Sequence, residues 1–323
     1  MKKFLAFALK AAVTSGLILL VLRDQDLSAV GDRLSEISLF SFLCAIALLV
    51  GQNVLAARRW VVVTGIFGQA LPYRSTLRFY FEGLFFNQAL PSTVGGDGVR
   101  MYRAVKAGLP VAAGVNGVLL DRISGLFALL GIVALTQPWL YDRVDDTSAH
   151  LAFAAVISAG VGGVLVLFLC GRMPGGLMRW SAARGLVGLS NGLTALFRNG
   201  AAAVEVFGLS FIGHIMMVSA IFLLTLDLQL NVSFIDCLIL VPGVMLLSAA
   251  PISIAGWGVR ESIMISAMSL VGAPEAGSLG LSLVYGVIMI LIGLAGGVLW
   301  LANSDRRVTD MENATEATVI GRE

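Results

Sequence analysis

Six apolar segments constrain this chain more than any other feature. Each is long enough to cross a hydrocarbon core of ~30 Å as a helix, and they lie at residues 4–22, 37–57, 111–136, 151–171, 203–226 and 279–302. Hydrophobic residues make up 58% of the chain and charged residues 13%, whereas a soluble domain is about half apolar and about one-quarter charged. Backbone polar groups inside a bilayer must bond to one another, so we expect an all-α polytopic membrane protein with about six spanning helices.

Charges in the loops predict how these segments are oriented. Lys2 and Lys3 precede the first segment, and no small-x-small cleavage site follows it, so we expect an uncleaved span with a cytoplasmic N-terminus. The acidic stretches at 23–36 and 142–146 are expected outside, and the arginine-rich stretches at 74–106 and 172–198 inside. Arg306 and Arg307 then place the C-terminus in the cytoplasm.

A Pro/Gly motif occurs twice where a helix would otherwise continue. Residues 89–100 read ALPSTVGGDGVR and residues 249–260 read AAPISIAGWGVR, with six identities in twelve positions and no gap. Proline removes a backbone donor and clashes with the preceding turn, and glycine adopts turn conformations closed to other residues. The motif therefore predicts a broken helix in each copy. The identical pairs are Ala89 and Ala249, Pro91 and Pro251, Gly96 and Gly256, Gly98 and Gly258, Val99 and Val259, and Arg100 and Arg260.

The positions of the two motifs predict an inverted-topology repeat. By the charge rule, segment 60–110 begins and ends inside, and segment 228–278 begins and ends outside. We interpret each as a re-entrant hairpin that is broken at its Pro/Gly stretch, and the two hairpins enter from opposite faces. One membrane domain, 1–302, would then contain repeat halves at about 37–136 and 203–302, followed by a polar cytoplasmic tail at 303–323.

Broken helices that meet near the midplane of a membrane form substrate sites in transporters of this kind. Helices that restart near Gly98 and Gly258 would direct free N–H groups toward an anionic ligand. The planar guanidinium of arginine suits phosphate oxygens. The alternative is a structural kink whose arginines reach the membrane interface. The candidate substrate-binding residues are Arg100, Arg260, Gly96, Gly98, Gly256, Gly258, Asn87, Asp121, Arg122, Glu261, Glu82 and Asp97.

Several of these candidates are charged or polar side chains at membrane depth. Asp121 and Arg122 point about 100° apart on a helix, so at least one of them needs another partner, in a substrate path or a structural ion pair. Glu261, directly after the second motif, has the same two interpretations. Glu82 and Asn87 either line a cavity or present polar groups to the cytoplasmic interface.

Other functional classes lack support in the sequence. We find no phosphate-binding loop, no metal-ligand spacing and no nucleophile–base set, so we expect neither an enzyme nor a cofactor or metal. The net charge of +2 is too small to indicate binding to nucleic acid.

Three motifs together resemble the lysylphosphatidylglycerol synthase transmembrane (flippase-like) family. They are Asn87-x3-Pro91…Gly96-x-Gly98-x-Arg100, the pair Asp121-Arg122 with Ile123-Ser124-Gly125, and Pro251…Gly256-x-Gly258-Val259-Arg260-Glu261. The resemblance implies a multi-pass protein of the bacterial-type cytoplasmic (inner) membrane that moves or handles lipids. The aminoacyl-transferase domain of the bifunctional members is not in this sequence. Where the family leads us to expect a Tyr-Arg pair, Tyr285 is followed by Gly286.

The resemblance and the repeat together predict a lipid flippase or transporter. Its substrate would be a phosphate-bearing lipid: an aminoacyl-phospholipid, a polyprenyl-phosphate-linked lipid or a glycolipid. The alternative is an accessory protein that does not translocate lipid but presents it to a partner glycosyl- or acyltransferase.

Overall fold

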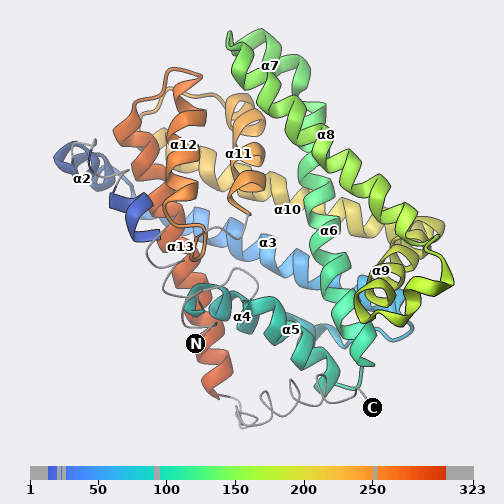
Figure 1. The fold of residues 1–323 in the computed structure, drawn as a ribbon. Helices are drawn as coiled ribbons and strands as arrows, with labels where there is room; N and C mark the ends of the chain where they lie inside the picture. Colours follow the sequence, from blue (N-terminus) through green and yellow to red (C-terminus); the bar gives the residue numbers. More distant parts are fainter. Residues whose placement is uncertain (1–13, 20–22, 24–26, 91–94, 250–252, 303–323) are drawn as a thin grey trace.

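The computed structural model describes residues 14–19, 23, 27–90, 95–249 and 253–302 (Figure 1). Five of its helices are long and apolar enough to cross a membrane, and they confirm five of the six predicted spans. The remaining predicted span, 4–22, lies largely outside the described residues. The chain is therefore an all-α polytopic membrane protein. The five helices are α3 (Leu39–Ile66), α6 (Val111–Leu135), α8 (Thr147–Cys170), α10 (Gly200–Asp227) and α13 (Glu275–Ala302).

Shorter helices occupy the two segments predicted as broken hairpins. The first segment holds α4 (Tyr73–Ala89) and α5 (Gly95–Lys106), and the second holds α11 (Phe234–Ser248) and α12 (Val259–Ser269). The motif prolines lie in the gaps at 91–94 and 250–252, outside the described residues. Gly256 and Gly258 adopt φ of +80° and +83°, in the left-handed region that glycine tolerates best, and α12 begins directly after them.

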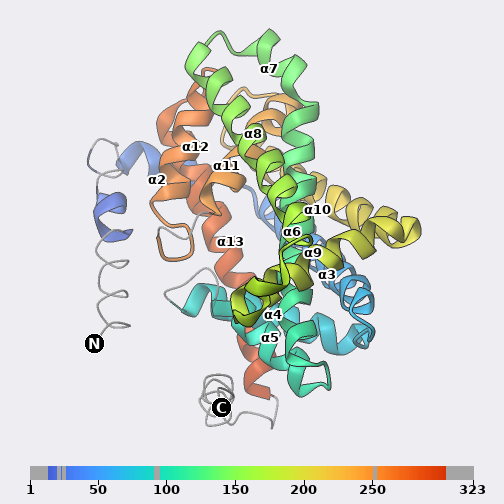
Figure 2. The same ribbon diagram turned by 45° about the vertical axis from the view of Figure 1, so that its right-hand side comes forward.

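The order of the helices is the same in the two halves of the chain. A long helix, two short helices and another long helix appear as α3–α6 and again as α10–α13, and both α3 and α10 have 28 residues. The two long first helices, α3 and α10, pack against each other, whereas α4 packs on α13 of the other half and α11 packs on α6. In both ribbon views the α4–α5 pair and the α11–α12 pair lie toward opposite ends of α13 (Figures 1 and 2).

Close helix contacts in this arrangement depend on glycine. Where α13 crosses α4, a Cβ at Gly296 would overlap the backbone carbonyl oxygen of Phe81, and a Cβ at Gly297 would press on the ring of Phe85. Small residues allow helix backbones to approach closely inside membranes, where packing drives association. The glycines of α13 thus hold the first hairpin against the second half of the chain.

The remaining helices surround these two units. They are α2 (Leu27–Ser35), which packs on α13, α7 (Gln137–Arg143), the 3-10 helix η1 (Gly175–Arg179) and α9 (Ser181–Arg198). Helix α8 buries only Ala149 among its residues, so most of its surface faces outward. The largest apolar cluster of the described residues draws most of its buried side chains from α10, α11, α12 and α13, including Ile221, Leu240, Met264 and Ile288.

Candidate functional site

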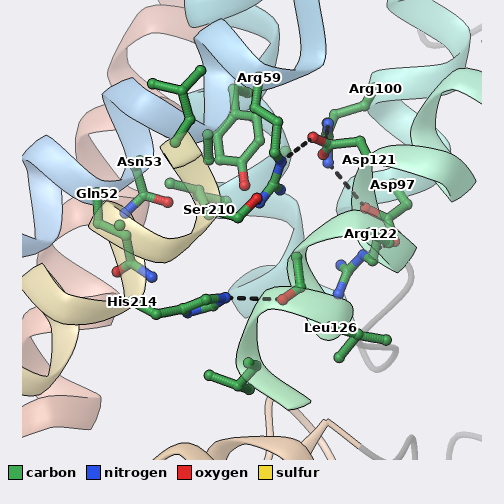
Figure 3. Close-up of a pocket in the computed structure, with 18 of the residues that line it drawn as sticks. Gln52, Asn53, Arg59, Asp97, Arg100, Asp121, Arg122, Leu126, Ser210 and His214 are labelled. Carbon is green, nitrogen blue, oxygen red and sulfur yellow. Dashed lines mark hydrogen bonds and ion pairs between the residues drawn. The ribbon is translucent and has the colours of Figure 1, made fainter. Parts of the chain in front are cut away.

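A cavity of about 460 Å³ lies between α3, α4, α5, α6 and α10 (Figure 3). The last residue before the second gap, Ala249, also lines it. Three arginines and two aspartates contribute to its wall, so these five groups leave an excess of one positive charge. They are Arg59, Arg100, Arg122, Asp97 and Asp121.

Asp121 connects two of these arginines. Its side chain is 1% exposed, and its two oxygens accept hydrogen bonds from Arg59 Nε at 2.8 Å and Arg100 Nη2 at 2.6 Å. Arg59 also donates from Nη1 to Ser210 Oγ at 3.0 Å. Because these side chains come from α3, α5, α6 and α10, the network joins both halves of the chain. Buried charges are tolerated only when paired in this way.

Asp97 pairs with Arg122 at the open side of the cavity. Arg122 Nε lies 2.5 Å from Asp97 Oδ2, and Arg100 Nη1 lies 3.6 Å from Asp97 Oδ1. The side chain of Arg122 is 42% exposed, whereas those of Arg59 and Arg100 are 8% and 5% exposed. Arg122 is therefore the most accessible of the three cations. Asp121 and Arg122 indeed take different partners, as their angular separation on a helix requires.

The first motif arginine, Arg100, is held between two aromatic rings. Its guanidinium carbon lies 4.2 Å from the ring centroid of Trp60 and 4.4 Å from that of Tyr80. Cations over aromatic faces are attracted by the ring quadrupole, most strongly when shielded from water. The stacking and the bond to Asp121 fix this guanidinium at the cavity wall.

The second motif arginine, Arg260, lies in a separate closed cluster and does not line the cavity. Its Nη2 donates to Glu261 Oε1 at 2.6 Å, and its Nε donates to Ser282 Oγ at 3.0 Å. Ser282 Oγ donates in turn to Glu261 Oε1 at 3.0 Å, and the backbone N–H of Gly258 donates to Glu261 Oε2 at 2.6 Å. Glu261 therefore both neutralises Arg260 and caps α12.

Aromatic stacking recurs around this second arginine. The guanidinium carbon of Arg260 lies 5.0 Å from the Trp257 ring and 5.3 Å from the Tyr285 ring. A Cβ at Gly286 would lie 2.5 Å from Arg260 Nη2 and 2.7 Å from the Trp257 ring. Gly286, at the position where an arginine was expected after Tyr285, thus leaves room for the guanidinium of Arg260.

Two residues of the first hairpin have mainly structural contacts. Asn87 lines the cavity and also accepts the Gly96 N–H at 2.9 Å, which ties the end of α4 to the start of α5. A Cβ at Gly96 would overlap the carbonyl oxygen of Gly83, whereas a Cβ at Gly98 meets open space. Glu82 is fully buried and accepts from Arg103 Nε at 2.7 Å.

The structure thus separates the twelve predicted residues into three groups. Five line the cavity, three others lie in the first hairpin beside it, and four belong to the second motif. The cavity residues are Asn87, Asp97, Arg100, Asp121 and Arg122. The residues beside it are Glu82, Gly96 and Gly98, and those of the second motif are Gly256, Gly258, Arg260 and Glu261.

Arg59 is the main cavity residue absent from the sequence prediction. Arg58 and Arg59 are adjacent in the sequence, and neighbours on a helix point in different directions. Arg58 is about half exposed and pairs with Glu205 at 2.7 Å, whereas Arg59 turns inward to Asp121. His214 also lines the cavity and bonds through Nε2 to the Gly125 carbonyl at 3.0 Å.

The wall of the cavity combines charged and apolar side chains. Among the described residues no cluster of three His, Cys, Asp or Glu side chains is arranged to hold a metal ion. Leucines such as Leu84, Leu126 and Leu129 share the wall with the charged groups. An amphiphile with an anionic head matches this mixture.

Comparison with known proteins identifies one family. The family model described as the lysylphosphatidylglycerol synthase TM region matches residues 7–297. A search of curated proteins finds no match to this chain.

Proposed function

Because the chain belongs to the family of the lysylphosphatidylglycerol synthase transmembrane region, we propose that it is a lipid transporter rather than an enzyme. The cavity receives the phosphate-bearing headgroup of a lipid, and the protein moves that lipid across the bacterial-type cytoplasmic membrane. The observation that carries this proposal is the excess of arginine over aspartate in a cavity lined by three candidate membrane-spanning helices, α3, α6 and α10, together with α4 and α5.

The accessible cation, Arg122, makes the first contact with the headgroup. Its partner Asp97 also faces Arg100. The phosphate oxygens of an entering lipid therefore take the place of the Asp97 carboxylate on Arg122 and Arg100. Arginine binds phosphate through two parallel hydrogen bonds, each stronger than a neutral one. Arg59 and Arg100, paired with the buried Asp121, supply positive potential behind the first contact.

Translocation in this proposal comes from one repeat rocking against the other. The repeated helix order and the exchanged packing of α4 on α13 and α11 on α6 support an inverted repeat. Both termini lie in the cytoplasm, and a lipid gradient or a coupled ion provides the direction. The lipid is an aminoacyl-phospholipid, a polyprenyl-phosphate-linked lipid or a glycolipid.

A matched pair of arginine variants tests the headgroup role. Arg122→Gln removes the accessible cation of the cavity, and Arg58→Gln removes a similarly exposed arginine, also paired with one carboxylate, that lies outside the cavity lining. We expect Arg122→Gln to weaken binding of a short-chain phosphatidylglycerol about tenfold, the loss of one charge-assisted hydrogen bond, and Arg58→Gln to bind normally. Equal affinities in both variants would refute the cavity as the headgroup site.

Proteoliposomes test translocation itself. Labelled phosphatidylglycerol in the outer leaflet is protected from a membrane-impermeant quencher once it has been moved, and we expect protein-dependent movement that Arg122→Gln slows. Headgroup binding without any movement would leave the accessory role, in which the protein presents lipid to a partner glycosyl- or acyltransferase.

A further inference from the structure

An apolar groove of about 250 Å³ runs between α6 and α8. Only apolar side chains and glycines line it, from α6, α8 and Leu246 of α11. The contributions of α8 recur at residues 156, 159, 160, 163, 164 and 167, which is the spacing of one helical face. Gly160 and Gly163 lie in the middle of this face. An added Cβ at Gly160 would overlap the side chain of Leu130, whereas at Gly163 it would meet no atom within 4 Å, so the groove is open at Gly163.

The length of the groove matches one leaflet of a bilayer. Val156 and Leu167 are eleven positions apart on α8, which corresponds to about 16 Å along the helix axis. A hydrocarbon core is ~30 Å thick, so one leaflet spans about half of that. The groove therefore has the length of a single hydrocarbon chain that stays within its leaflet.

The groove adjoins the charged cavity. Leu126 lines both of them. On α6, Arg122, Leu126 and Leu130 follow at intervals of four residues, so they lie on one face. Arg122 and Leu126 are labelled on α6 in the view of the cavity (Figure 3). Along this face the lining changes from a cation in the cavity to an apolar side chain in the groove, as a lipid changes from head to tail.

We propose that the α6–α8 groove binds one acyl or prenyl chain of the lipid whose phosphate-bearing headgroup lies in the cavity. This inference rests on the proposed function and adds the path of the tail. The hydrocarbon chain passes Leu126 and lies against Gly163 of α8, where the groove is open. Affinity for the lipid then depends on both the charge of its head and the length of this chain.

Two neighbouring glycines provide a matched test. Gly163 lines the groove and Gly162 does not, and a Cβ at either position meets no atom within 4 Å. The Cβ of Gly163→Leu therefore meets no atom of the protein and its side chain takes up space in the groove, whereas Gly162→Leu adds the same side chain at a neighbouring position that does not line the groove. Ala159→Phe, one turn away in the groove, is the second variant if Gly163→Leu does not fold.

The probe is phosphatidylglycerol with a photoactivatable group in one acyl chain, in nanodiscs that contain the purified protein. Mass spectrometry then gives the position of the crosslinks. We expect crosslinks on the groove face of α6 and α8 in the wild type and in Gly162→Leu. In Gly163→Leu we expect them to fall about tenfold, the effect of displacing roughly two methylene groups from an apolar site.

The headgroup dependence separates a substrate site from ordinary lipid contact. A neutral diacylglycerol with the same photoactivatable chain, or the Arg122→Gln variant, should label the groove far less than the anionic lipid labels the wild type. Equal labelling by both lipids, or unchanged labelling in Gly163→Leu, would overturn the inference even if the protein moves lipid. Headgroup-dependent labelling in a protein that moves no lipid would uphold the groove while the transport proposal fails.

Discussion

Removing the carboxylate of Asp121 should destabilise the protein far more than removing an otherwise similar surface carboxylate. Asp121 bonds to Arg59 at 2.8 Å and to Arg100 at 2.6 Å, and its side chain is 1% exposed. Breaking a buried ion pair by deleting one partner costs about 3–5 kcal/mol, because the other charge stays buried without compensation. In Asp121→Asn one amide oxygen still accepts a hydrogen bond and Asp97 still faces Arg100, so we expect a loss of about 3 kcal/mol, at the low end of that range.

The matched control is Glu205→Gln. Glu205 pairs with Arg58 at 2.7 Å, and Arg58 is the neighbour of Arg59 on α3. The side chain of Glu205 is 39% exposed and that of Arg58 is 48% exposed. Exposed ion pairs contribute about 0–1 kcal/mol, so this variant should unfold nearly as the wild type does.

Unfolding of both variants by a denaturing detergent, in mixed micelles of fixed composition, measures the difference. Losses in unfolding free energy that agree within about 1 kcal/mol, the contribution of an exposed pair, would refute the burial argument. That result would mean that water reaches the network and screens it as it screens the surface pair. In lipid-binding assays Asp121→Asn should also raise the affinity for anionic lipid, since the positive excess of the cavity grows by one charge.

Three further predictions concern the motif and the topology. Gly96→Ala should lower the free energy of unfolding by about 1–3 kcal/mol, because its Cβ would overlap the backbone of α4. Gly98→Ala, whose Cβ meets no atom, should be neutral or stabilise the protein by up to about 1 kcal/mol. Equal melting temperatures for the two variants would contradict the close approach of α4 and α5. Gly286→Ala should also destabilise by about 1–3 kcal/mol, because its Cβ would press on the stacked guanidinium beside it; an unchanged melting temperature would contradict that packing. In a cysteine-free background, single cysteines at Ser75 and Gln229 should react with an impermeant thiol reagent from the cytoplasmic and the outer side, respectively; labelling of both from one side would contradict the inverted repeat.

Hydropathy predicted the membrane helices because it depends on residues that are local in the chain. Five spans were predicted to within several residues at most of their ends, and the short helices fall where the Pro/Gly motif interrupts an apolar segment. Membership of the lipid-handling family, predicted from the three motifs, is confirmed by the match over residues 7–297. The inverted orientation of the halves stays a prediction.

The site was less predictable because burial of a charge depends on partners distant in sequence. Arg58 and Arg59 are adjacent and chemically identical, yet one pairs at the surface and the other reaches Asp121. The demand of Asp121 for a partner was evident from the sequence, but 62 residues separate it from Arg59. The aromatic partners of Arg100 were equally hidden, since nothing in the sequence links Trp60 and Tyr80 to Arg100 before the helices pack.

The two motif copies differ in what their arginines can do. The repeat suggested two equivalent phosphate ligands, and both arginines are indeed stacked between Trp and Tyr rings. Arg260 is neutralised by the adjacent Glu261 and sealed by Ser282, whereas Arg100 shares Asp121 with Arg59 and lines an open cavity. Only the first copy therefore contributes to a surplus of positive charge. All five charged groups that leave this surplus of one charge come from the first half of the chain, so the proposed headgroup site depends on the first copy of the motif and not on the second.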